Sequence, residues 1–200
     1  PEVLDIDPDR TTVIVIDMQN ACIAKGGMFD LGGLDVSKAR QCIGPINRIM
    51  TASRARERRV IFIQHQYAPD FREVGDPESV LWVKSRSYIL YHEQPEWRDK
   101  LLIRGTWGAE IDQALSRNEN DICVEKARYT AFWGTNLDTI LKTLDTRYLA
   151  ICGCWANMCV EATLRDASNY GYYPILVKDA VAATSAESLE STSENAAFYG

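Results

Sequence analysis

Histidine is scarce in this chain, since His65 and His92 are the only two among 200 residues. The six cysteines include no C-x-x-C pair. Structural zinc sites are built from Cys and His ligands at such spacings, so we expect no metal, and nothing suggests another cofactor. Cys123 and Cys152 lie in apolar, strand-like runs, where a thiol behaves as a small hydrophobic side chain. With 46% hydrophobic residues the chain can build a core without disulfides, so we expect a reduced, cytoplasmic protein.

Excess positive charge and long apolar runs are missing as well. The formal net charge is −6, so the chain has no overall basic field to attract nucleic acid or an anionic membrane. One basic run, from Arg54 to Arg59, is typical of the solvated end of a helix. No stretch of about 18 apolar residues occurs, so we expect no membrane-spanning helix. Because neither nucleic acid nor a membrane is expected to bind, we expect the partner to be a small-molecule substrate.

Short apolar runs alternate with segments of helical periodicity along the chain. The runs are rich in β-formers and nearly continuous in apolar side chains, which is typical of strands buried on both faces. Alternating strands and helices imply a parallel sheet with helices on both faces. We therefore expect a single domain over residues 1–200, with a three-layer α/β/α fold and a doubly wound, mainly parallel, Rossmann-like sheet. The expected strands cover residues 11–17, 59–65, 121–126, 147–153 and 173–179.

The segments between the strands differ in regularity. Asp35 is the expected N-cap of the first helix, and Gly171 is expected to close the fourth. Residues 66–108 are predicted to be irregular, and their tryptophans favour a packed lid or an oligomer contact over disorder. The expected helices cover residues 35–57, 109–115, 136–144, 157–170 and 185–198.

Reactive side chains gather where the expected strands end. In doubly wound sheets, ligands bind outside the carboxyl ends of the strands. Asp17, His65 and Lys126 end three strands, and Cys159 begins the helix after the fourth. The N–H groups and the dipole at a helix start favour a thiolate and can stabilise an oxyanion. Because a carboxylate, a cation and a thiol form a complete nucleophilic unit, we predict Cys159 as nucleophile with Asp17 and Lys126 as partners.

Each of these residues also has an ordinary structural interpretation. Cys159 can be a core residue of an amphipathic helix, Asp17 a turn residue and Lys126 a solvated cation. His65 ends a neighbouring strand, so a Cys–His pair with His65 as the base is an alternative to Asp17. Asp179 fits a cap of the turn after the fifth strand better than a chemical role.

Three motifs resemble the isochorismatase-like cysteine hydrolases, in the right order and on the right elements. They are residues 13–20, which read VIVIDMQN, then Lys126, and residues 159–166, which read CVEATLRD. The resemblance implies a catalytic triad of Asp17, Lys126 and Cys159. It also implies a non-proline cis peptide between Cys154 and Trp155, which helps to aim the backbone amides of Met158 and Cys159 at an oxyanion. We further expect a homo-oligomer, either a dimer or a tetramer.

Within the family, the chain is most similar to ureidoacrylate amidohydrolases. The resemblance leads us to expect an aromatic residue where this chain has Cys22, Asn where it has His65, and Trp where it has Tyr67. Nicotinamidases carry an Asp-x-His metal motif after the second strand, and this chain reads QHQY there. Vinyl-ether-cleaving relatives often lack the cysteine, so the complete triad favours amide or ureide hydrolysis. The expected substrate contacts are Gln19, His65, Tyr67, Glu73 and Tyr129, with Phe71 and Trp107 as further apolar walls.

The expected function is therefore that of a cysteine amidohydrolase. It would cleave the C–N bond of a small linear amide, ureido or carbamoyl substrate through a Cys159 thioester. Two alternatives stay open. One is an isochorismatase-like hydrolase of another small molecule, and the other is a thiol redox sensor that uses Cys159 with Cys154 nearby.

Overall fold

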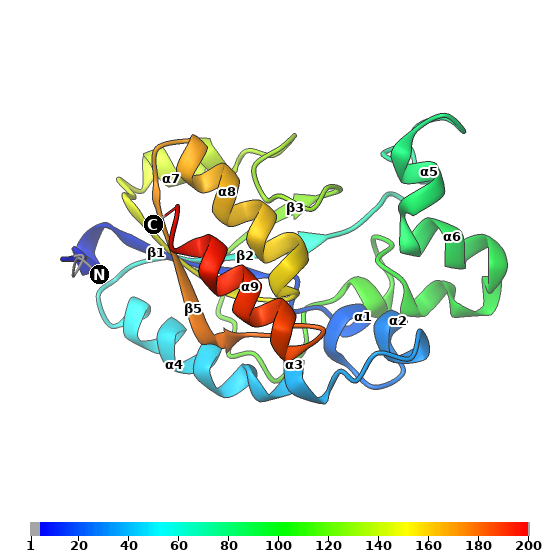
Figure 1. The fold of residues 1–200 in the computed structure, drawn as a ribbon, viewed down its shortest axis with the longest axis horizontal. Helices are drawn as coiled ribbons and strands as arrows, with labels where there is room; N and C mark the ends of the chain where they lie inside the picture. The colour runs from blue at the N-terminus through cyan, green and yellow to red at the C-terminus, as the bar shows by residue number, and fades with distance from the viewer. Residues whose placement is uncertain (1–4, 200) are drawn as a thin grey trace.

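The computed structural model describes residues 5–199, whose centre is a five-stranded parallel sheet (Figure 1). The strand order is β3-β2-β1-β4-β5, and every neighbouring pair is parallel. This arrangement confirms the predicted doubly wound fold. The chain order turns back between β1 and β4, which makes the carboxyl ends of these strands the switch point of the sheet. The strands are β1 (Thr11–Ile16), β2 (Val60–His65), β3 (Ile122–Lys126), β4 (Tyr148–Gly153) and β5 (Tyr173–Val181).

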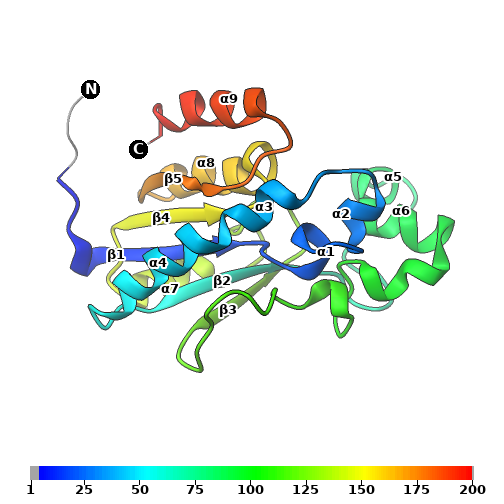
Figure 2. The ribbon, with the colours of Figure 1, turned by 90° about the horizontal axis from the view of Figure 1, so that it is seen from below.

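The strands at the centre of the sheet are covered on both faces. All six residues of β4 are buried, as are five of the six residues of β1. In Figure 1, α7 (Leu137–Thr143) and α8 (Glu161–Asn169) lie on one side of the strands and α4 (Ile43–Arg54) on the other. Helix α9 (Ala186–Ala196) packs beside β5 at the edge of the sheet (Figure 2). The apolar runs of the sequence therefore form the sheet, which is the middle one of the three layers.

The edge strand β3 explains one error of the sequence analysis. Cys123 was predicted to be a buried, small hydrophobic residue, but its side chain is exposed. Along β3, Cys123 and Glu125 are exposed while Val124 and Lys126 are buried. Among the residues described only β2 pairs with this strand, which therefore lies at the edge of the sheet. Its alternate residues point to opposite faces, and the face that holds Cys123 and Glu125 is open to solvent.

The predicted helix over residues 35–57 is divided into α3 (Ser37–Gln41) and α4. Pro45 is the physical reason, because proline has no N–H to donate to the preceding turn and is tolerated only in the first turn of a helix. A new helix begins at Ile43, which places Pro45 in that first turn. Asp35 accepts a hydrogen bond from the Ser37 amide at 3.0 Å, although the N-cap position itself is held by Val36.

Residues 66–108 are more regular than predicted. They contain α5 (Val80–Lys84), α6 (Arg86–Glu93) and the 3-10 helices η2 (Pro95–Lys100) and η3 (Trp107–Ala109). The signals were present in the sequence, because Ser79 and Ser85 cap α5 and α6 by accepting hydrogen bonds from Trp82 and Tyr88. We call residues 80–93 the α5–α6 lobe; it projects beyond the carboxyl end of the sheet, at the right of Figure 1.

The predicted helix over residues 109–115 is not formed. Its backbone pairs instead with the segment that follows β1, since Asn20 donates to Glu110 and Asp112 donates to Met18. These bonds, at 2.9 and 3.0 Å, take the polar groups that a helix would need for itself. The same segment after β1 holds α1 (Asn20–Ile23) and α2 (Met28–Leu31), and η1 (Pro8–Arg10) precedes β1. Among the residues the structure describes, no helix has both the length and the hydropathy of a membrane span.

Candidate active site

Asp17 occupies the first position after β1, where the backbone turns. Its φ of 51° lies in the left-handed region, which Asp adopts more readily than most residues. Its amide donates to Ile63 at 3.0 Å and its carbonyl accepts from the Gln19 amide at 2.8 Å, so the turn is fixed to the neighbouring strand. The side chain is 4% exposed, and Oδ1 has no hydrogen-bond partner among the residues described. A buried carboxylate with one unpaired oxygen is available as a proton acceptor.

Lys126 ends β3 and reaches across β2 to Asp17. Its Nζ lies 2.9 Å from Asp17 Oδ2 and 3.0 Å from the carbonyl of Arg128, and its side chain is fully buried. Burial lowers the pKa of Lys126, but the charge of Asp17, the neighbouring Cys159 sulfur and the hydrogen bonds to both outweigh burial and leave the pKa above its ordinary value. Lys126 is therefore an ammonium group, and it compensates the buried charge of Asp17.

Cys159 is brought to this pair by a sharp turn after β4. Gly153 approaches β1 so closely that a Cβ on it would lie 2.1 Å from the Ile16 carbonyl, and its φ is 113°. Glycine is required at this position because any side chain would collide with β1. The next peptide bond, between Cys154 and Trp155, is cis, as the sequence analysis expected. The π-helix η4 (Ala156–Val160) then carries Cys159 beneath the pocket.

The backbone around Cys159 departs from a helix at one residue. Met158 has φ −124° and ψ −107°, which rotates the peptide plane between Met158 and Cys159 away from the helical direction. The Met158 N–H donates to the Trp155 carbonyl at 3.0 Å. Of the two amides expected to face an oxyanion, that of Met158 is therefore engaged within the turn. The Cys159 amide stays our candidate donor.

The Cys159 thiol lies 3.2 Å from Lys126 Nζ. Burial raises the pKa of Cys159 well above its ordinary value, Asp17 raises it further, and Lys126 opposes both. The sequence analysis expected the helix start to favour a thiolate, but in this structure the buried thiol holds its proton. A base is then needed to remove that proton, and the carboxylate of Asp17 is beside it.

His65, the alternative base, contacts Lys126 and lies close to both Asp17 and Cys159. Its Nδ1 is 3.3 Å from Lys126 Nζ, and its ring centroid is 5.2 Å from that of Tyr67. Burial lowers the pKa of His65 well below its ordinary value, and the charges of Lys126 and Arg128 lower it further. An imidazole that resists protonation is a poor acceptor for the thiol proton, so we favour Asp17 as the base.

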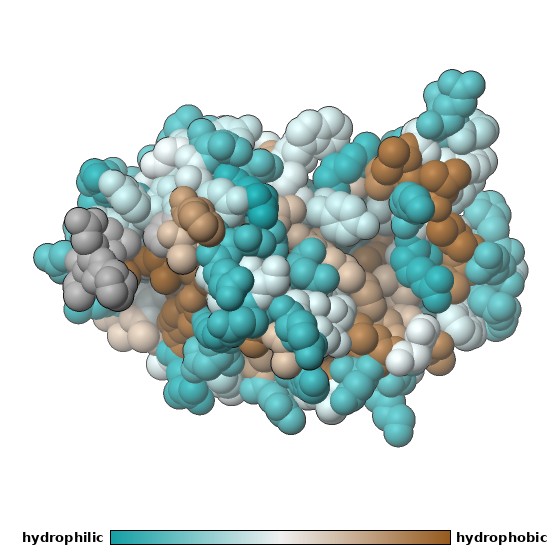
Figure 3. Space-filling view, viewed as in Figure 1, coloured by the Kyte–Doolittle hydropathy of each residue, from teal (hydrophilic) through white to brown (hydrophobic). Residues whose placement is uncertain are grey.

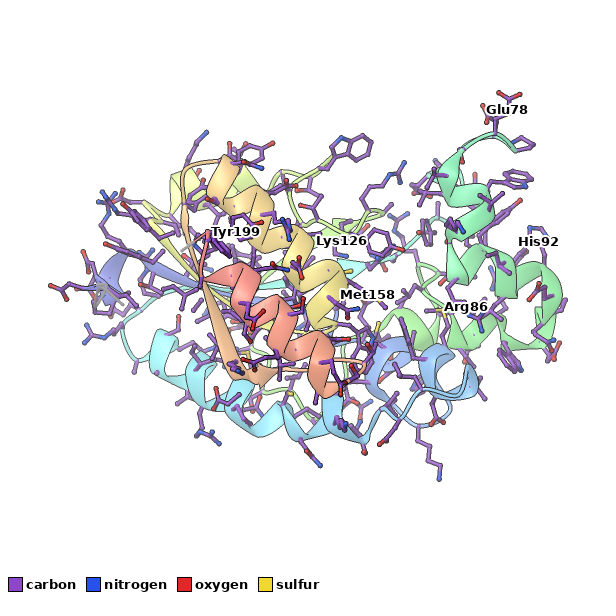
Figure 4. The ribbon with its side chains drawn as sticks, viewed as in Figure 1. Glu78, Arg86, His92, Lys126, Met158 and Tyr199 are labelled. Carbon is purple, nitrogen blue, oxygen red and sulfur yellow. The ribbon has the colours of Figure 1, made fainter. Side chains whose placement is uncertain are left out.

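Asp17, His65 and Cys159 line one cavity of about 340 Å³. The cavity is closed on one side by the end of the sheet and on the other by the α5–α6 lobe. In Figure 3, apolar residues in brown gather between this lobe and the body of the molecule. Figure 4 shows Met158 and Arg86, both of which line the cavity, on the two sides facing each other. The apolar part of the lining consists of Met28, Phe29, Leu34, Leu81, Leu102, Ala127, Trp155 and Met158.

Comparisons with known proteins show the family of the chain. The family model described as the isochorismatase domain matches residues 11–199. The chain belongs to the isochorismatase family. It is 38% identical over 180 residues to the ureidoacrylate amidohydrolase RutB of Agrobacterium fabrum. It is 41% identical over 180 residues to the enzyme of the same name from Methylorubrum extorquens. The matches cover 90% of this chain and 79% and 73% of those relatives.

Solved structures of the isochorismatase family share this fold. A cysteine hydrolase from Pseudomonas syringae pv. phaseolicola is 31% identical, with a TM-score of 0.71 over 89% of this chain and 75% of that one. The N-carbamoylsarcosine amidase of Thermoplasma acidophilum is 25% identical, with a TM-score of 0.70 over 94% of this chain and 93% of that one. Both superpose on most of the chain, so this chain shares their fold.

Three of the five predicted substrate contacts lie at the cavity of this isochorismatase-family chain. His65, Tyr67 and Tyr129 all line it. Gln19 does not, because its side chain is buried and tied to three backbone partners: the amide and carbonyl of His65 and the carbonyl of Ala109. A side-chain amide whose oxygen and nitrogen are both engaged in this way serves to hold β1 and β2 together.

Glu73 is also absent from the cavity. Its carboxylate accepts a hydrogen bond from the Ala68 amide at 3.0 Å, which closes the turn after β2. Phe71, expected as a wall, packs instead against Tyr88 and Tyr91 beneath the lobe, with ring centroids 5.4 and 5.0 Å away. The Lys100 ammonium lies 4.5 Å from the ring centroid of Trp107. Trp107 does not line the cavity. The loop was rightly expected to supply the wall, and Tyr67 does so, but Phe71 and Trp107 do not.

The residues that sequence analysis missed come mostly from the lobe. Lys84, Ser85 and Arg86 line the cavity, and so does Cys22 after β1. Arg128, two residues beyond Lys126, adds a third cation, and its guanidinium lies 4.8 Å from the Trp133 ring centroid. The Ser79 and Ser85 capping signals could have revealed the lobe helices, but nothing local in the sequence indicates that α6 folds back over Cys159.

A metal could be imagined among Asp17, His65 and Cys159, whose ligand atoms lie within 4.8 Å of one another. Lys126 Nζ, however, is within 3.3 Å of all three side chains. Its positive charge already occupies the centre of the group, and a divalent ion there would be strongly repelled. These residues do not fit a resident metal, and metal independence stays a prediction.

Proposed function

We propose that this protein is a cysteine amidohydrolase that releases ammonia from the ureido or carbamoyl group of a small carboxylic acid. The observation that carries the proposal is the contact of Lys126 Nζ with both Asp17 and Cys159, at 2.9 and 3.2 Å, on the floor of a cavity. The names of the relatives, ureidoacrylate amidohydrolases and an N-carbamoylsarcosine amidase, support C–N bond cleavage of this kind.

The first half of the reaction forms a covalent intermediate. Asp17 takes the proton from the Cys159 thiol, and the sulfur attacks the ureido carbonyl carbon. Negative charge then develops on the former carbonyl oxygen, where the Cys159 amide can donate a hydrogen bond. The C–N bond breaks when Asp17 returns the proton to the departing nitrogen. Ammonia leaves, and the acyl group stays on sulfur as a thioester, which for a ureide is a thiocarbamate.

The second half restores the enzyme. Asp17, again ionised, takes a proton from a water molecule that attacks the thioester carbon. The C–S bond breaks, and the thiol regains its proton from Asp17. Lys126 holds the carboxylate in place throughout, and it offsets charge whether that charge lies on Asp17 or on Cys159.

The charge around the cavity supports a carboxylate on the substrate. The charged residues that line it are Asp17, Lys84, Arg86 and Arg128, and the charge of Asp17 is matched by Lys126. Three cations therefore remain, in a protein whose formal net charge is −6. A cavity with this excess of positive charge concentrates small anions. The apolar lining leaves room for a short hydrocarbon segment between the carboxylate and the ureido group.

The test is ammonia release from N-carbamoylglycine and from ureidoacrylate, with propylurea as the uncharged comparison. We expect turnover of at least one acid, and a loss of more than about 10³-fold in Cys159→Ala. Cys123→Ala is the matched control, because Cys123 is an exposed thiol outside the cavity. Ammonia release that survives in Cys159→Ala would remove the nucleophile from the proposal.

No observation favours the redox alternative. Cys154, its second thiol, is buried and donates to the Asp17 carbonyl at 3.1 Å, and burial raises its pKa well above the ordinary value. A thiol of this kind reacts slowly with oxidants. We also propose a cytoplasmic homo-oligomer, supported by six free cysteines and by the exposed aromatic rings of Tyr129 and Trp133 near the cavity. Light scattering of the purified protein tests the assembly.

A further inference from the structure

Polar atoms without partners point to where a substrate is bound. In the described part of the chain, four buried side-chain nitrogen or oxygen atoms have no hydrogen-bond partner: Asp17 Oδ1, Ser53 Oγ, His65 Nε2 and Trp155 Nε1. Three of these four residues, all except Ser53, line the cavity above Cys159. Buried polar atoms are normally paired, so a cluster of unpaired ones in a cavity indicates that a ligand supplies the partners. Asp17 Oδ1 faces the thiol chemistry, which leaves His65 Nε2 and Trp155 Nε1 to contact the substrate.

The tautomer of His65 follows from its neighbour. Lys126 is an ammonium group, which can donate hydrogen bonds and cannot accept them. Its Nζ is 3.3 Å from His65 Nδ1, and a hydrogen on Nδ1 would point at this cation, so Nδ1 carries the lone pair. A neutral imidazole with an accepting Nδ1 carries its hydrogen on Nε2. His65 Nε2 is therefore an N–H donor, and it is the atom that lacks a partner.

The backbone that carries the His65 ring is fixed in its position. Its amide donates to Gln19 Oε1 at 2.8 Å, and its carbonyl accepts from Gln19 Nε2 at 3.0 Å. The residue also pairs with Lys126 in the register between β2 and β3. A donor held by such bonds needs little reorganisation when a ligand arrives, and this raises its value for recognition.

We propose that His65 determines specificity by donating a hydrogen bond from Nε2 to a second oxygen of the substrate, outside the reacting carbonyl. The proposal rests on the proposed function and adds a substrate feature to it. A ureido acid offers such an oxygen in its carboxylate, whereas an alkylurea of the same length does not. A substrate that presents an N–H group at this point would leave two donors facing each other and is disfavoured.

A second consequence concerns the hydrogens of Lys126. Four acceptors surround Nζ: Asp17 Oδ2, Arg128 O, Cys159 Sγ and His65 Nδ1. An ammonium group has only three hydrogens, so one acceptor is always without one. Removing the His65 nitrogen leaves one hydrogen for each of the other three, including the sulfur. Replacing His65 should therefore not weaken the nucleophile, and a more constant bond to sulfur stabilises its thiolate.

The experiment compares His65→Phe and His65→Gln with the wild type and with His92→Gln, which changes the only other histidine. Phenylalanine keeps the ring without a donor, and glutamine can place an N–H near the same point. We expect His65→Phe to lower kcat/KM for N-carbamoylglycine by about 10- to 100-fold, and for propylurea by less than about threefold. His65→Gln should recover part of the loss, and His92→Gln should match the wild type.

Two further readouts separate substrate recognition from other roles. Iodoacetamide labelling of Cys159, followed by mass spectrometry, should be as fast in His65→Phe as in the wild type, or faster. Nitrogen NMR of the ligand-free protein should show the hydrogen of His65 on Nε2. Labelling that slows in parallel with turnover would make His65 a base or a support for the thiol and overturn the proposal, as would equal losses on both substrates or a hydrogen on Nδ1. A wild type that hydrolyses neither N-carbamoylglycine nor ureidoacrylate would refute the proposed function instead.

Discussion

Lys126 and Asp17 form an ion pair at 2.9 Å whose side chains are 0% and 4% exposed. A buried pair of this kind adds little net stability, but the loss of one partner leaves a charge with no compensation. We expect Lys126→Met to lower the free energy of unfolding by about 3–5 kcal/mol. Ammonia release should also be lost, because the carboxylate would hold its own proton and could not take that of the thiol.

The matched control for this variant is Lys142→Met. Lys142 pairs with Asp138 at 2.7 Å, but its side chain is 69% exposed, so its removal should cost less than about 1 kcal/mol. Urea unfolding of both variants gives the comparison. Similar losses of stability in the two proteins would mean that the Asp17 charge is relieved in some other way, for example by protonation.

The pH dependence of stability should report the state of His65. Its pKa is far below the ordinary value in the folded protein, because of burial, Lys126 and Arg128, while the unfolded chain titrates near about 6.5. Below that pH the unfolded state binds a proton that the folded state does not, so stability falls as the pH falls. The groups that face the ring are Lys126, Arg128, Asp17 and Cys159, together with Tyr67.

The wild type should therefore lose up to about 1.4 kcal/mol of unfolding free energy per pH unit more than His65→Phe, between pH 6.5 and the folded pKa. His92 and the carboxylates are common to both proteins, so the difference between the two curves isolates His65. Parallel curves from pH 7 to pH 5 would show that His65 titrates normally in the folded state.

Metal removal should leave the enzyme unaffected. The ligand atoms of Asp17, His65 and Cys159 are close enough to suggest an ion, but Lys126 Nζ takes its place within 3.3 Å of each side chain. We expect ammonia release to be unchanged, within about twofold, after dialysis against a strong chelator. Inactivation that zinc, iron or manganese reverses would show that Lys126 moves away and that the site binds a cation.

The three residues at the strand ends could be predicted because sequence position alone places them together. Parallel strands bring their carboxyl ends to one edge, so Asp17 and Lys126 could be expected at the same edge once the strands were recognised, although Lys126 reaches across β2 to make the contact. The protonation of Cys159 could not be predicted, because it depends on burial by residues distant in sequence. Gln19 and Glu73 were misjudged because their bonds to the His65 and Ala68 backbones exist only after folding.

Arg86 provides the sharpest test of the substrate class, because it lies in the lobe and takes no part in the chemistry. It lines the cavity, and its Nη2 is near Gly32, where an added Cβ would lie 3.4 Å from it. Within residues 5–199, no carboxylate forms an ion pair with this guanidinium, so its charge is available to a ligand. A hydrogen bond to a charged group is worth about 1.5–3 kcal/mol.

We therefore expect Arg86→Met to raise KM for N-carbamoylglycine by about 10- to 100-fold while kcat changes little, since the bond is made equally in the ground and transition states. Propylurea, which has no carboxylate, should show no change. Arg98→Met is the matched control, because Arg98 is also an exposed arginine of this region but does not line the cavity. The effect should shrink at high salt, where the attraction between unit charges is screened. A rise in KM of the same size for both substrates would mean that Arg86 shapes the cavity and does not bind the acid, and the carboxylate would have to be dropped from the proposed substrate.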